Sequence, residues 1–145
     1  MSRWYPAVDS HWSASKAAKM GVFGALGFAA WIGVPATIAI AAGHVRMGFI
    51  SPIEVAVVMV LASVALFAAW RFRHHQGLIV GPVILVALIL EVAKRIALMF
   101  GGTLSFGVFD AVVTIMMFFG LLNGIRGVRA LRHLSPDDDL EEIFQ

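Results

Sequence analysis

Residues 78–100 read LIVGPVILVALILEVAKRIALMF, and this stretch decides the fold class of the protein. An α-helix rises about 1.5 Å per residue, so roughly 20 residues cross a hydrocarbon core that is about 30 Å thick. The stretch meets that length, and it lacks the strict alternation of apolar and polar residues that a membrane β-strand shows. It therefore predicts a membrane-spanning helix.

Three further stretches have the same character, and they are residues 20–42, 52–70 and 104–125. We therefore expect an all-α fold, an integral membrane four-helix bundle that occupies residues 20–125. A polar segment at the membrane interface, residues 1–19, would precede the bundle. Residues 126–145 would form a basic extension of the fourth helix and a short amphipathic tail in the cytoplasm.

The composition argues for the same class of protein. Of the 145 residues, 60% are hydrophobic and 14% are charged, whereas soluble domains have about 45–50% and about 25%. The chain has too few polar residues to cover a surface that faces water, which argues against a soluble enzyme and against a disordered segment. The net charge of +2 is too small to indicate nucleic-acid binding.

The sequence contains none of the common signatures of catalysis. It has no cysteine, which excludes disulfides, thiolate metal sites and cysteine nucleophiles. It has no zinc-hydrolase, P-loop or nucleophile-elbow motif. No histidine lies inside a predicted span, where helical bundles that bind haem would place theirs. We therefore expect no enzymatic activity, no cofactor and no bound metal.

The distribution of lysine and arginine predicts the orientation. With four spans, both termini lie on one side of the membrane, and the loops on the opposite side hold only Arg46. Because loops rich in lysine and arginine remain in the cytoplasm, we expect both termini to be cytoplasmic in the inner membrane. The basic residues on that side are Arg3, Lys16, Lys19, Arg71, Arg73, Arg126, Arg129 and Arg132.

Three charged residues interrupt the apolar stretch 78–100. Glu91 falls near its middle, and Lys94 and Arg95 follow at positions i+3 and i+4, which places all three on one helix face. A charge at the bilayer centre costs about 2.5–3.5 kcal/mol on insertion scales. We therefore expect this face to point into protein or water and away from lipid.

Asp110 is the predicted partner of these charges. The third and fourth helices are joined by a short link around Thr103, so Arg95 and Asp110 lie at similar distances from the turn. Glu91 could pair with Arg95, and Asp110 with the remaining cation, Lys94 or Arg95. Such a network could serve as a proton or ion path or an anion site, could dock a helix of another subunit, or could only fix the register of the helices.

Glu54 lies near the outer end of the second predicted span. Ser51-Pro52-Ile53-Glu54 has the form of a capping box, in which Glu54 reaches back to the amide of Ser51. In the alternative interpretation, Glu54 joins the charged network from its outer mouth. His44 and Arg46 are further candidates for residues at that mouth.

Small residues in the first span predict close helix packing. Gly21, Gly24 and Gly27 recur every three residues, and small side chains allow membrane helices to approach closely. Pro35 removes a backbone donor and is expected to kink this helix.

The C-terminal residues combine a basic and an acidic segment. Arg126, Arg129 and Arg132 recur every three residues and would attract anionic lipids or a partner. In the acidic segment that follows, Leu140, Ile143 and Phe144 share one helix face. This segment is either a solvated tail or a short helix that docks on a partner or on the basic rim of the chain itself.

The sequence resolves function only to two classes. The first is an accessory or regulatory subunit of a larger membrane assembly, which carries an intramembrane charge network. The second is a small homo-oligomeric transporter or channel for protons, ions or a small anionic solute. Both classes imply a lipid bilayer and further copies or other chains as partners.

Overall fold

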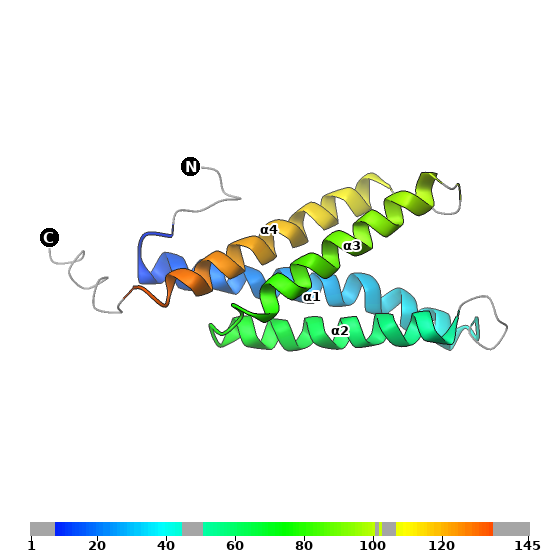
Figure 1. Cartoon of the computed structure of the whole chain (residues 1–145), viewed down its shortest axis with the longest axis horizontal. Helices are drawn as coiled ribbons and strands as arrows, with labels where there is room; N and C mark the ends of the chain where they lie inside the picture. Colours follow the sequence, from blue (N-terminus) through cyan, green and yellow to red (C-terminus); the bar gives the residue numbers. More distant parts are fainter. Residues whose placement is uncertain (1–7, 45–50, 101, 103–106, 135–145) are drawn as a thin grey trace, which may run out of the picture.

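The computed structural model describes residues 8–44, 51–100, 102 and 107–134. These residues form four α-helices: α1 (His11–Ala41), α2 (Pro52–Arg73), α3 (Val80–Phe100) and α4 (Val108–Ala130). Successive helices run in opposite directions, so α1 begins and α4 ends at the same end of the molecule (Figure 1). The expected all-α fold is confirmed for the described residues.

Three of the four helices, α1, α2 and α4, are long and apolar enough to cross a membrane. The helix α3 has 21 residues and is mostly apolar, but it contains Glu91, Lys94 and Arg95. These three charges lie close together within α3, whereas those of α2 and α4 lie nearer the helix ends. The length and composition of α1, α2 and α4 therefore indicate a membrane protein.

The first helix begins earlier than the apolar pattern predicts, at His11 and not near Met20. Ser10 caps it, because its Oγ accepts from the amide of Ser13 at 3.2 Å, while Ser13 Oγ accepts from the amide of Ser10 at 3.1 Å. Much of the segment that was expected to be separate and polar is therefore the first turns of α1. A helix of 31 residues is about 46 Å long, which exceeds the hydrocarbon core.

Glycines bring α1 and α4 into backbone contact. A Cβ atom on Gly24 would lie 2.7 Å from the backbone nitrogen of Leu121, and one on Gly120 would lie 3.1 Å from Cα of Gly24. Gly124 faces Gly21 in the same way. The close packing predicted for Gly21 and Gly24 is thus directed at a matching series of glycines on α4.

The helix α1 is the centre of the bundle. It packs extensively on α4 and on α2, whereas α2 and α3 contact each other much less. The aromatic ring of Phe72, which is fully buried, fills the space beside Gly21 and Gly81. The pair α3 and α4 diverges from α1 and α2 towards the end where α2 begins (Figure 1).

Candidate functional site

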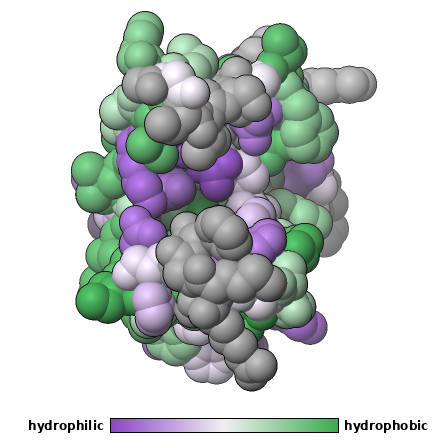
Figure 2. Space-filling view, turned by 90° about the vertical axis from the view of Figure 1, so that its right-hand side faces the viewer, coloured by the Kyte–Doolittle hydropathy of each residue, from purple (hydrophilic) through white to green (hydrophobic). Residues whose placement is uncertain are grey.

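A cavity of about 360 Å³ lies between α1, α2 and α3. Ile32, Val58 and other apolar side chains form most of its wall, and charged residues reach it from two helices. Seen from the end at which α2 begins and α3 ends, hydrophilic residues gather around a hollow (Figure 2). The charged lining residues are Glu54 from α2 and Glu91, Lys94 and Arg95 from α3, whose formal charges sum to zero.

The three charges of α3 share the face that lines this cavity. Arg95 Nε lies 3.3 Å from Glu91 Oε1, the i,i+4 pair that helical geometry allows. Both side chains are mostly covered, with 20% and 18% of their surfaces exposed. Lys94 is exposed and makes no ion pair within the described part of the chain.

The structure corrects the partner predicted for Asp110. Within the described residues, this carboxylate makes no ion pair with Lys94 or Arg95. Its Oδ1 accepts from Trp31 Nε1 at 3.4 Å, and its Oδ2 accepts from the backbone amide of Gly107 at 3.2 Å. Asp110 is the third residue of α4, so its side chain turns back to satisfy an amide at the start of its own helix.

Trp31 lies between Arg95 and Asp110, which the sequence analysis places opposite each other. The guanidinium carbon of Arg95 is 3.8 Å from the centre of a Trp31 ring, which is a cation–π contact. A continuous series of contacts therefore runs from Glu91 through Arg95 and Trp31 to Asp110. It joins α3, α1 and α4, so the acidic and basic groups interact through an aromatic side chain and not by direct pairing.

The structure also corrects the capping box predicted for Glu54. Ser51 is the N-cap of α2 and Pro52 follows as the first helical residue, but no side chain caps this helix. Glu54 lines the cavity and makes no hydrogen bond or ion pair to any described residue. It therefore occupies the position of the alternative interpretation, at the mouth of the charged cavity.

Pro35 interrupts the hydrogen bonding of α1 beside the cavity. It lies inside α1 and lines the cavity. Because proline has no N–H, the carbonyl of Trp31, four residues earlier, has no helical donor.

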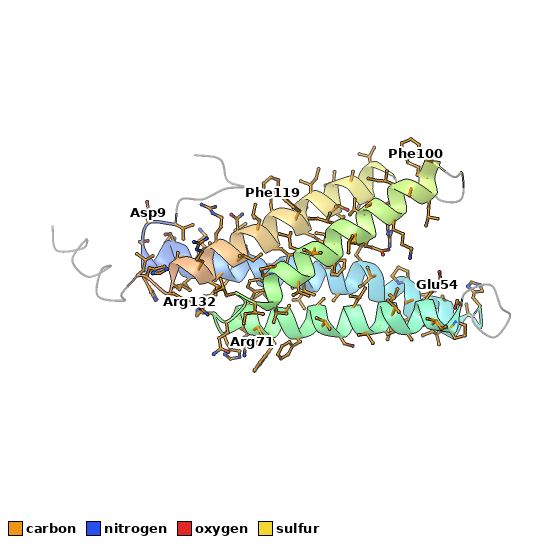
Figure 3. All side chains as sticks on the ribbon, in the orientation of Figure 1. Asp9, Glu54, Arg71, Phe100, Phe119 and Arg132 are labelled. Atoms are coloured by element: carbon orange, nitrogen blue, oxygen red, sulfur yellow. The ribbon has the colours of Figure 1, made fainter. Side chains whose placement is uncertain are left out.

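Basic residues occupy the opposite end of the molecule, where α2 and α4 end. Figure 3 shows Arg71 and Arg132 at that end and Glu54 and Phe100 at the other. Arg126 donates from Nη1 to Oδ1 of Asn123 at 3.2 Å, and Asn123 is fully buried.

His75 follows α2 at the same end. Its pKa is lowered by burial first, and then by the charges of Lys19, His11 and His74.

Several predicted contact residues lie outside the site or outside the described residues. Arg126 and Arg129 belong to the last turns of α4, and Arg132 lies in the turn that follows. His44 follows the end of α1 and does not line the cavity. The remaining candidates, Arg46, Leu140, Ile143 and Phe144, lie outside the described residues.

Sequence reasoning missed two elements of this arrangement. The first is Trp31, although a tryptophan in the middle of an apolar stretch is a signal, because its buried N–H needs an acceptor. The second is the series Gly120, Gly124 and Gly127 on α4, whose spacing of four and three residues marks a helix interface.

Comparisons of the chain with protein-family models, with curated proteins and with solved structures give no match. The geometry of the cavity and of the helices is therefore the basis on which a function can be proposed.

Proposed function

We propose that the protein is a four-span inner-membrane protein with both termini in the cytoplasm, and that it is an accessory or regulatory subunit of a membrane assembly. The separation of charge along the bundle supports this orientation. Arg71 and Arg132 lie at the end where α1 begins, and Glu54 lies at the other. Basic residues are typical of the cytoplasmic side, and Arg126 and Arg129 would contact anionic lipids there.

The charge contacts of α3 make it suitable as a membrane span in addition to α1, α2 and α4. A charge at the bilayer centre is costly, and such residues normally face the interior of a bundle and pair with other groups. Glu91 pairs with Arg95, and Arg95 also covers the ring of Trp31. These contacts reduce the cost of placing α3 among lipids.

One observation supports a subunit role above all: the other described helices leave a long side of α3 open. Val86 and Leu90 are 55% and 64% exposed, and Ala93 and Ala97 are also exposed on the same face. Two small residues four positions apart allow another helix to approach closely. We infer that a helix of a partner subunit covers this face.

Purification from native membranes in a mild detergent tests this proposal. The tagged full-length chain is expected to emerge with a second chain in fixed ratio. Val86→Trp should remove that chain, because it places a large side chain on the open face of α3. Val60→Trp is the matched control, since Val60 is 62% exposed on α2. A chain that always purifies alone, or a partner lost equally with both variants, would contradict the proposal.

The cavity supports a second candidate, a homo-oligomeric transporter or channel for protons, ions or a small anionic solute. Its charged lining residues include the ion pair of Glu91 and Arg95. Four helices are too few to form an alternating-access pathway alone, so several copies of the chain would be needed. Reconstituted protein should then show flux in a pH or ion gradient. Glu91→Gln should abolish this flux, and the absence of flux in every gradient would exclude this candidate.

A further inference from the structure

Two opposite charges at the cavity make no ion pair with any residue that the structure describes. Glu54 and Lys94 both line it, from α2 and α3, and neither makes an ion pair with another described residue. The other two charges, Glu91 and Arg95, already neutralise each other. Among the described residues, the cavity therefore offers one carboxylate and one ammonium group without a counter-charge, on two different helices.

The rest of the lining limits which molecule fits between these groups. Most of the wall is apolar, and the volume of about 360 Å³ lies within the range of small-molecule sites, roughly 300–1,000 Å³. A simple anion would leave Glu54 unpaired, and a simple cation would leave Lys94 unpaired. Both side chains are exposed within the chain, so in the membrane placement proposed above each would face lipid, where a charge without a counter-charge is unfavourable.

We propose that this cavity binds a zwitterion, a molecule that carries both an ammonium group and an acidic phosphate or carboxylate group. The acidic group binds Lys94, and the ammonium group binds Glu54. The ligand is either the headgroup of a phospholipid such as phosphatidylethanolamine or a free zwitterion of similar size. This inference rests on the membrane placement proposed above, but it does not depend on which assembly the chain joins.

Fluorescence of Trp31 provides the readout, because this ring contacts Arg95 at the cavity. The protein for this experiment is the full chain with the other three tryptophans replaced by phenylalanine, in bilayers of phosphatidylglycerol, whose headgroup is only anionic. The probes are phosphatidylethanolamine in the bilayer and, in separate samples, phosphoethanolamine, ethanolamine or inorganic phosphate in solution. A zwitterion is expected to bind at least tenfold more tightly than ethanolamine or phosphate alone.

Variants of Glu54 and Lys94 test which cavity residue binds each charged group of the ligand. Glu54→Gln and Lys94→Gln should each weaken zwitterion binding by on the order of tenfold, which corresponds to the loss of one charged contact. Arg73→Gln, at the opposite end of α2, is the matched control and should leave binding unchanged. Because either cavity variant could misfold, helical circular dichroism and elution volume are measured for each. The exchange Glu54→Lys with Lys94→Glu restores one charge of each sign and should recover binding.

The outcomes distinguish the two possible sources of the ligand, and they distinguish this inference from the proposed subunit role. Binding of phosphatidylethanolamine but not of phosphoethanolamine identifies a lipid headgroup, and the reverse identifies a free solute. Equal binding of ethanolamine, phosphate and the zwitterion would overturn the inference, as would wild-type affinity in both folded glutamine variants. Co-purification of a partner is measured separately and uses Val86, which does not line the cavity. The failure of one proposal is therefore distinguishable from the failure of the other.

Discussion

Substituting alanine for Gly24 should open the interface between α1 and α4. The added Cβ atom would lie 2.7 Å from the backbone nitrogen of Leu121 and 2.9 Å from the backbone oxygen of Met117, whereas ordinary contacts begin at 3.4 Å. Because both neighbours are backbone atoms, the helices must separate by roughly 0.7 Å. A gap of 0.5–1 Å removes about a quarter to a half of the dispersion attraction between atoms, and overpacking of this kind costs about 1–3 kcal/mol.

Gly27→Ala provides a control on the same helix. Its Cβ atom would lie 3.1 Å from Cγ of Met117, a flexible side chain that can move away. Both substitutions gain the same helix propensity of about 1 kcal/mol over glycine, so this gain cancels when the two variants are compared. The free energy of unfolding should therefore be lower for Gly24→Ala than for Gly27→Ala by about 1–3 kcal/mol.

Gly120→Ala tests whether a backbone neighbour is less tolerant of an added methyl group than a side-chain neighbour at the same distance. Its Cβ atom would also lie 3.1 Å from its nearest neighbours, but these are the backbone Cα of Gly24 and the backbone oxygen of Met20. It should be less stable than Gly27→Ala at the same contact distance. The assay is reversible unfolding of the purified protein in mixed micelles of increasing SDS content, followed by tryptophan fluorescence. If all three variants unfold within about 0.5 kcal/mol of one another, the glycine contact does not hold the bundle together.

Three further predictions use the same unfolding assay. Trp31→Phe keeps an aromatic ring but removes the donor to Asp110, and it should lower the free energy of unfolding by about 1 kcal/mol; an unchanged value would show that this hydrogen bond contributes nothing. Asn123→Leu removes the fully buried acceptor of Arg126 and should cost about 1–3 kcal/mol, whereas a gain would show that the arginine is satisfied elsewhere. The lowered pKa of His75 means that the folded state binds this proton less readily than the unfolded state, so stability should fall as the pH drops through about 6.5. His75→Asn, which tolerates the positive φ of 57° at this position, should make that fall shallower, and an identical pH profile would contradict the assignment.

The apolar runs were sufficient to predict the helices, because burial in a membrane requires long apolar stretches whatever their partners are. They did not predict where α1 begins. The serine pair that caps α1 lies within a polar segment, and the first turns are held by contacts with α4 that no local pattern encodes. Gly127 packs on the backbone of Ala14 and Ala18, so an alanine-rich stretch that looked interfacial is part of the bundle.

For the charged residues too, the local sequence predicts one part of the arrangement, and contacts between helices decide the rest. Spacing along α3 was sufficient to predict that Glu91 and Arg95 lie within reach of each other, because that distance depends only on helix geometry. The position of Asp110 depends on how α4 is rotated about its axis and on what α1 places in between. Matched depth across a turn is therefore not enough to predict an ion pair, since the side chain of Trp31 occupies the space between the two groups.

The contact of α1 with α4 also has a consequence for biogenesis. Gly24 and Gly120 meet although nearly one hundred positions of chain separate them, and contacts between distant segments form late. In the membrane placement proposed above, α1 would enter the bilayer during synthesis with its glycine face uncovered, and that face would stay uncovered until α4 leaves the ribosome. A chain interrupted before Gly120 therefore lacks the surface that closes the bundle, and its exposed glycine face would distinguish it, for a membrane protease, from a finished molecule.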